Sequence, residues 1–116
     1  MAVQVEEDGA LTVRHEGTVA SLREVVLAEG LAMISLTQVL GWDLHLNSDL
    51  RKNVAAQANT TMLGTVTLVE RPGRKADVVL RYNFPFSGLS DGALQTLVLM
   101  VLDGGVAART ALTHLS

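Results

Sequence analysis

The residues of this sequence that can do acid–base or metal chemistry are scattered along the chain. The three histidines, His15, His45 and His114, stand far apart, and none lies at ligand spacing from a carboxylate. The sequence therefore holds no H-E-x-x-H or comparable zinc pattern. There are no cysteines, which excludes disulfides and thiolate metal ligands. We expect no metal site, and we expect His45 to be a surface residue.

The acidic residues and the serines form no catalytic pattern. Glu6, Glu7 and Asp8 precede a glycine in a polar segment, where water solvates carboxylates and nothing raises a pKa for proton transfer. No serine stands in the glycine frame of a hydrolase nucleophile, and no glycine-rich loop carries the lysine of a phosphate site. The sequence thus predicts a protein that is not an enzyme and needs no cofactor.

The composition is apolar for so small a protein. The chain has 116 residues, of which 48% are hydrophobic and 18% charged. This length fits one domain, residues 1–116, whose high ratio of surface to volume calls for more polar surface. We therefore expect part of the apolar surface to be buried against another chain, in a homodimer or with another protein.

Neither end of the chain carries a targeting pattern. The first ten residues are acidic where a secretory signal would be basic and then apolar. The longest uncharged apolar run, around residues 94–102, is about half the length that a membrane-spanning helix needs. We expect a soluble cytoplasmic protein without a membrane partner.

Two turn sequences predict β-hairpins. Asp-Gly at positions 8 and 9 separates stretches in which valine and leucine alternate with polar residues, and both turn residues tolerate positive φ. Pro72-Gly73 presets a type II turn between strands expected over 65–70 and 76–84. The second strand alternates between its faces, with Val78, Leu80, Tyr82 and Phe84 on one and Asp77, Val79, Arg81 and Asn83 on the other.

The segment between these hairpins is expected to be largely helical. Ser21 and Glu24 have the spacing of a capping box, which predicts a helix over 21–30. Residues 31–41 fit neither the helical nor the strand period, and we favour a continuing helix. A short strand over 42–46 should turn Trp42, Leu44 and Leu46 inward.

Two further helices are predicted from their caps. Asn47 or Ser48 can cap a helix whose apolar residues recur at roughly helical spacing. Ser90 or Asp91 can cap another, which Gly104 or Gly105 should end before a weaker final helix. The order ββα(α)βαββα(α) predicts an α+β domain with an antiparallel sheet packed with helices.

The helix expected over 91–103 is the most informative feature. From Ala93 to Leu102 only Gln95 and Thr96 are polar, so its apolar arc is wider than packing on one sheet requires. The helix can be enclosed between the sheet and the final helix, or it can form a homodimer or partner interface, and both can hold. The residues expected in such a contact are Leu94, Leu97, Val98 and Val101 of the helix and Val78 and Leu80 of the neighbouring strand.

Two alternatives remain open. Four basic residues near one hairpin tip, Arg71, Arg74, Lys75 and Arg81, could contact phosphates of a nucleic acid. Against this, the chain has a net charge of −3, whereas binders of this kind usually carry a large basic face. The other alternative is a small-molecule sensor with a pocket near Trp42 and Tyr82.

The stretch from about residue 48 to 113 resembles the C-terminal half of YbjN-type domains, which are similar in fold to class I type III secretion chaperones. The resemblance rests on a helix with Asn53 and Asn59 followed by "LGTVTLVERPGRKADVVLRYNFPFSGLSDGALQTLVLMVLDGG". It implies a small, commonly dimeric α+β protein that binds protein segments and is not a catalyst. The hairpin at the start departs from that plan, which opens with a helix, and no functional residue is carried over.

Overall fold

The computed structural model describes residues 1–58 and 60–115, with side chains described as far as Leu112. Asn59 and the side chain of His114 therefore lie outside the described residues. The elements follow one another as β1 (Ala2–Val5), β2 (Leu11–His15), β3 (Thr18–Ala28), β4 (Leu31–His45), α1 (Ser48–Ala58), β5 (Thr65–Arg71), β6 (Lys75–Pro85) and α2 (Asp91–Leu115).

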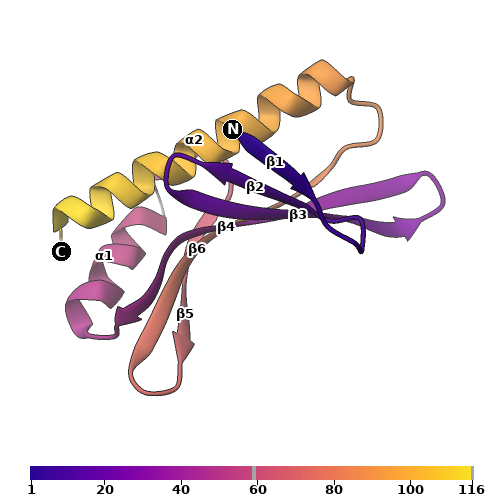
Figure 1. Cartoon of the computed structure of the whole chain (residues 1–116). Coiled ribbons are helices and arrows are strands. Elements are labelled where there is room, and N and C mark those ends of the chain that lie inside the picture. Colours follow the sequence, from indigo (N-terminus) through magenta and orange to yellow (C-terminus); the bar gives the residue numbers. More distant parts are fainter. Residues whose placement is uncertain (59, 116) are drawn as a thin grey trace.

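The six strands form one antiparallel sheet in the order β1-β2-β3-β4-β6-β5. Helix α2 lies along one face of the sheet, and α1 lies near the carboxyl-terminal end of α2 and against β5 (Figure 1). The expected α+β fold with an antiparallel sheet packed with helices is confirmed. The opposite face of the sheet carries no helix among the described residues.

The predicted helices over 21–30 and 31–41 are wrong. Both segments belong to one long hairpin, in which Ser21 lies opposite Thr37 and Glu24 opposite Ile34. Gly30, expected to end a helix, has a φ of 78° in the turn of this hairpin. The observed order is ββββαββα.

Buried and partly exposed residues alternate along parts of β3 and β4, but the sequence does not show this alternation clearly. Thr18, Ala20 and Leu22 of β3 are buried on one face, as are Leu36, Gln38 and Leu40 of β4. Two of these six core positions hold polar residues, so the apolar alternation that signals a strand is interrupted. Pairing between β3 and β4 stabilises the strand conformation that the local pattern does not predict. Ser21 and Glu24 have the spacing of a capping box but lie within β3, so they cap no helix.

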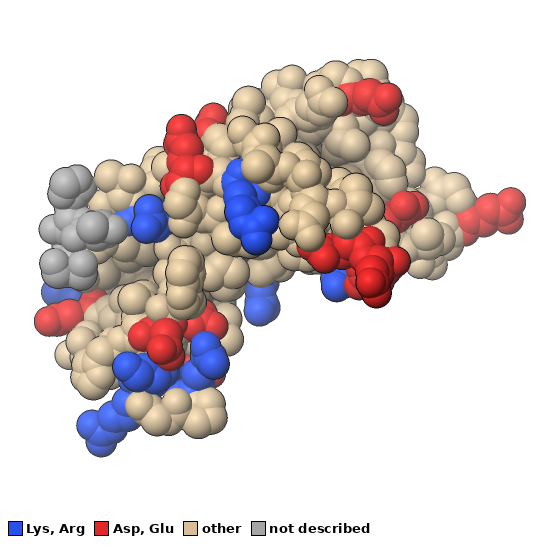
Figure 2. All heavy atoms as spheres, in the orientation of Figure 1, with Lys and Arg blue, Asp and Glu red and all other residues tan. Residues whose placement is uncertain are grey.

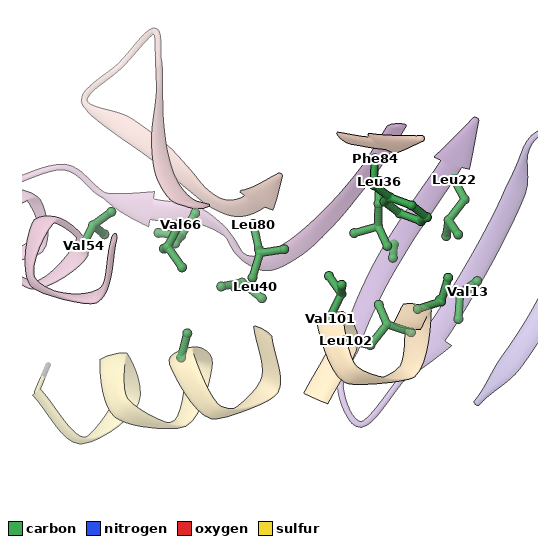
Figure 3. Packing of buried hydrophobic residues seen from close by; sticks show 14 residues of the cluster. Val13, Leu22, Leu36, Leu40, Val54, Val66, Leu80, Phe84, Val101 and Leu102 are labelled. Carbon is green, nitrogen blue, oxygen red and sulfur yellow. The ribbon is translucent and has the colours of Figure 1, made fainter. Parts of the chain in front are cut away.

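The core lies between α2 and the covered face of the sheet (Figure 3). Val101 and Leu102 of α2 point at the strands and are fully buried. Leu80 and Phe84 of β6 face them, as the alternation of that strand predicted. Val54 anchors α1 to the same cluster.

Other expectations hold in part. Both hairpins form, and α1 is capped by Asn47, whose Oδ1 accepts the Leu50 N–H at 2.8 Å. Residues 42–45 are a strand but only as the end of β4. Trp42 is 58% exposed, not inward, because the register of β4 against β6 shifts around Gly41.

Helix α2 is longer than predicted. Its N-cap is Ser90, whose Oγ accepts the Ala93 N–H at 3.1 Å. The helix continues through Gly104 and Gly105 to Leu115. Residues 91–112 contain an 18-residue window with a mean hydropathy of 1.3 and are long and apolar enough to cross a membrane by length and composition. The core helix of a soluble protein can pass the same test, and α2 places its Val98, Val101, Leu102 and Ala108 in the core cluster.

Candidate protein-binding groove

An apolar groove of about 470 Å³ lies between the first turns of α2 and the sheet. In Figure 1 these turns rise away from the β3–β4 hairpin, so α2 leaves that part of the sheet uncovered. The groove is lined from the sheet by Val3, Leu11, Val13, Leu22 and Ile34, and from the helix side by Phe86, Leu94 and Val98. We call this hollow the apolar groove.

The register of the first three strands explains why the groove is apolar. Val3 pairs with Val13 and Val5 with Leu11, so all four side chains lie on the face that α2 covers further along. Leu11 pairs in turn with Leu22 of β3. The alternation around Asp8-Gly9 therefore places Val3, Leu11 and Val13 in the groove and Val5 beside it on the same face. Val3 and Val5 remain 54% and 70% exposed.

A charged turn lies beside the groove, which Gly9 and Arg23 help to line. Arg23 donates to Asp8 at 2.7 Å, and the backbone N–H of Ala10 donates to the same carboxylate at 3.1 Å. The Ala10 N–H, and after it the Arg23 guanidinium, hold the pKa of Asp8 below its usual value. The charged and polar side chains at the groove are Arg23, Glu24 and Gln95.

A second hollow of about 460 Å³ lies between the end of β4, α1 and the last turns of α2. Its lining mixes apolar residues with His45, Asn47, Asp49, Asn53 and Arg109. His45 is exposed, as the sequence predicted. Arg109 donates its Nε to the Leu40 carbonyl at 3.1 Å, which ties α2 to β4.

The predicted interface residues are mostly internal. Val78, Leu80 and Val101 are at most 1% exposed and Val98 is 7% exposed, so these four side chains pack within the protomer. They were expected at a contact with another chain; within the protomer, β6 lies between β4 and β5, and these side chains belong to the core cluster. Leu94 and Leu97 are half-buried. Leu94 and Val98 line the apolar groove.

The four basic residues of the nucleic-acid alternative do not form one free cluster. Arg71 pairs with Asp77 at 3.3 Å. Arg74 and Lys75 are exposed at the β5–β6 turn, whereas Arg81 lies opposite Thr37 on the uncovered face of the sheet. The side chains are thus spread along β6 and partly neutralised.

Folding brings together one set of ionisable residues that sequence spacing missed. His15 Nε2 lies 2.7 Å from Asp103 Oδ1, and Glu16 lies close enough that ligand atoms of the three are within 4.8 Å of one another. His15 ends β2, and Asp103 is in α2, so no local pattern relates them. The His15–Asp103 contact fastens the β2–β3 turn to the helix.

Trp42 and Tyr82 lie apart along the β4–β6 pair, because Trp42 follows Gly41, which pairs with Val78, whereas Tyr82 pairs with Leu36. Tyr82 stacks on Phe84 with ring centroids 5.2 Å apart, and it faces the core. Trp42 lies near the far end of β4. Neither residue lines the apolar groove or the second hollow.

Comparison with known proteins gave no match to a family model, to a curated protein or to a solved structure.

Proposed function

We propose that this protein is a non-enzymatic, chaperone- or adaptor-like interaction module, homodimeric, that holds an apolar segment of another protein in the apolar groove. The observation that carries the proposal is the lining of that groove, which is aliphatic and aromatic apart from Gly9 and three polar side chains. Its volume is within the range of about 300–1,000 Å³ common for ligand sites.

The energetics of burial support a partner. Fully burying an aliphatic side chain stabilises by roughly 1.5–3 kcal/mol, and Val3 and Val5 beside the groove are more than half exposed. Val26, on the same face of the β3–β4 hairpin, is 68% exposed. Binding of a partner segment that covered these side chains would be favoured by this free energy, because it removes their apolar surface from water.

The chemistry of the groove favours binding over catalysis. Among the described residues that line it, the ionisable side chains are Arg23 and Glu24. Neither a hydroxyl or thiol nucleophile nor a histidine base is among them, and covalent catalysis needs such a pair within hydrogen-bond reach. The groove therefore offers shape and apolar area.

The proposal is tested by binding to an array of immobilised peptides that differ in apolar content. We expect wild-type binding to rise with apolar content and to fall at least tenfold in Val3→Glu, because the new carboxylate would have to be desolvated at the groove. Thr65→Glu is the matched control, since this exposed side chain lies on β5, opposite Arg81 on the other face of the sheet, and is not part of the groove.

Circular dichroism on both variants verifies that the fold is retained. Wild-type protein that binds no peptide, or binds without regard to apolar content, would refute the proposed function. So would equal binding by Val3→Glu and Thr65→Glu.

A further inference from the structure

Strand β1 is an unprotected edge of the sheet. It is the end strand of the order β1-β2-β3-β4-β6-β5 and pairs with β2 without a bulge. Its sequence, Ala-Val-Gln-Val, contains neither a charge nor a proline. Charges, prolines and bulges are the usual means by which proteins keep edge strands from pairing.

The outward backbone groups of β1 can be assigned from the hairpin. The Glu6 N–H donates to the Ala10 carbonyl at 2.8 Å, so residues 6 and 10 form a hydrogen-bonded pair. Hydrogen-bonded pairs alternate along an antiparallel ladder, so Gln4 and Ala2 also bond to β2. The N–H and C=O groups of Val3 and Val5 consequently point away from the sheet.

We propose that a second copy of this chain pairs with that edge, β1 against β1 in antiparallel orientation about a two-fold axis at Gln4. This inference rests on the proposed function, because it identifies the contact that forms the proposed homodimer. In this register Val3 lies opposite Val5 of the second copy, and the two copies exchange four backbone hydrogen bonds. The contact is isologous, as most homodimer contacts are.

The side chains of β1 suit the same register. Val3 and Val5 lie on the groove face of the sheet and are 54% and 70% exposed. In the proposed dimer, Val3 of each copy contacts Val5 of the other, because directly opposite side chains lie on the same face of the sheet. The two apolar grooves then adjoin, and a single partner segment can span both.

The acidic residues after β1 do not oppose this pairing. The carboxylates at position 6 of the two copies are roughly 13 Å apart along the strands, beyond the Debye length of about 8 Å at physiological salt. Glu6 accepts the Thr12 hydroxyl at 2.8 Å, and Asp8 is paired with Arg23. These carboxylates are therefore held within their own hairpin.

The opposite edge of the sheet lacks these properties. Strand β5 ends in Glu70 and Arg71, and α1 lies against it. Arg51 of α1 forms an ion pair with Glu70. A second strand would have to displace this contact, which leaves β1 as the edge open to pairing.

Light scattering of the full chain with a proline variant provides the first test. We expect the wild type at micromolar concentration to have twice the 12.4 kDa mass of one chain. Val5→Pro should be monomeric, because it removes two of the four bonds between copies while the N–H that it deletes makes none within the hairpin. Val5→Thr keeps the N–H and should stay dimeric.

A monomeric wild type, or a Val5→Pro variant that remains dimeric, would overturn the inference. Should Val5→Pro lose its circular-dichroism spectrum, cysteine cross-linking gives an independent answer. The chain has no cysteine, so each variant carries a single thiol.

The cross-linking test reads the register directly. Gln4→Cys places two Cα atoms about 4.5 Å apart across the axis, within disulfide range, and should give an oxidised dimer. Val3→Cys is the control, because its Cα atoms are roughly 8–9 Å apart in this register and cannot be bridged. Equal cross-linking of both variants, or none in Gln4→Cys, would contradict the pairing.

These outcomes separate the two proposals. Peptide binding by a monomeric wild type would leave the apolar groove as the functional site and remove the β1 contact. A dimer with the Gln4→Cys cross-link but without peptide binding would leave the contact and remove the proposed function.

Discussion

Gly105 of α2 and Gln38 of β4 lie in close contact at the centre of the core. Gln38 is fully buried, and its Nε2 donates to Thr18 Oγ1 at 2.8 Å and to the Leu102 carbonyl at 3.1 Å. A Cβ atom on Gly105 would come close to Gln38 Oε1. The glycine therefore lets the helix lie directly on a polar side chain.

We predict that Gly105→Ala destabilises the fold by about 1–3 kcal/mol, because the methyl group overpacks the site and displaces the Gln38 amide from its partners. Gly104→Ala should stabilise by about 0.5–1 kcal/mol, since no atom lies within 4 Å of its Cβ position and alanine favours helix. Urea unfolding measures both free energies.

A double variant checks the cause. Gln38→Ala clears the space that the Gly105→Ala methyl group needs, so the double variant should be less destabilised than the sum of the single variants. Strict additivity would show that the contact between these two residues is not what constrains α2.

At the scale of elements, the β3–β4 hairpin shows how pairing overrides local pattern. Ser21 has the spacing of a helix cap, yet its neighbours are Thr12 on β2 and Thr37 on β4. These side chains share the uncovered face of the sheet, where β-branched residues fit well. Ser90, by contrast, has the sequence pattern of an N-cap and also makes the capping hydrogen bond in the structure.

The two serines give a matched pair of substitutions. We predict that Ser21→Val leaves the free energy of unfolding unchanged or raises it by up to about 1 kcal/mol, as expected for a strand. Ser90→Val should lower it by about 0.5–2 kcal/mol, as expected for the loss of an N-cap. Urea unfolding compares them, and a loss in Ser21→Val similar to that in Ser90→Val would speak against the strand.

In the molecule as a whole, charge is unevenly divided between the two halves of the sequence. Residues 1–50 have two basic and eight acidic side chains, and residues 51–116 have seven basic and four acidic. The structure is 44 Å long and 26 Å wide. In Figure 2 the charged side chains towards the β3–β4 end are mainly acidic (red), whereas several basic ones (blue) lie around the β5–β6 hairpin together with acidic ones.

This distribution predicts that the protein is not retained on immobilised single-stranded DNA even at low salt, where phosphate contacts are strongest. The reason is that Arg71 and Arg51 are paired with Asp77 and Glu70. A variant with Glu70→Lys and Asp77→Lys is the control and should be retained more strongly. Wild-type retention that salt reverses would favour the nucleic-acid alternative.

Local patterns in the sequence predicted the parts of the structure that depend on neighbouring residues. Turn residues define the hairpins at Asp8-Gly9 and Pro72-Gly73 through their φ preferences, and Asn47 and Ser90 define helix starts through single hydrogen bonds. The two faces of β6 followed from strict alternation. Each of these features depends on a few neighbouring residues, which is why a pattern can reveal it.

The other features depend on tertiary contacts. Residues 21–41 become strands because they pair with each other and with β2 and β6, while buried Thr18 and Gln38 obscure their period. Helix α2 continues past Gly105, where the absence of a Cβ atom lets the helix pack directly against Gln38. The apolar groove arises where α2 leaves the sheet, and the His15–Asp103 contact joins residues 88 positions apart. Such features depend on contacts between residues that are distant in the sequence, so no local pattern predicts them.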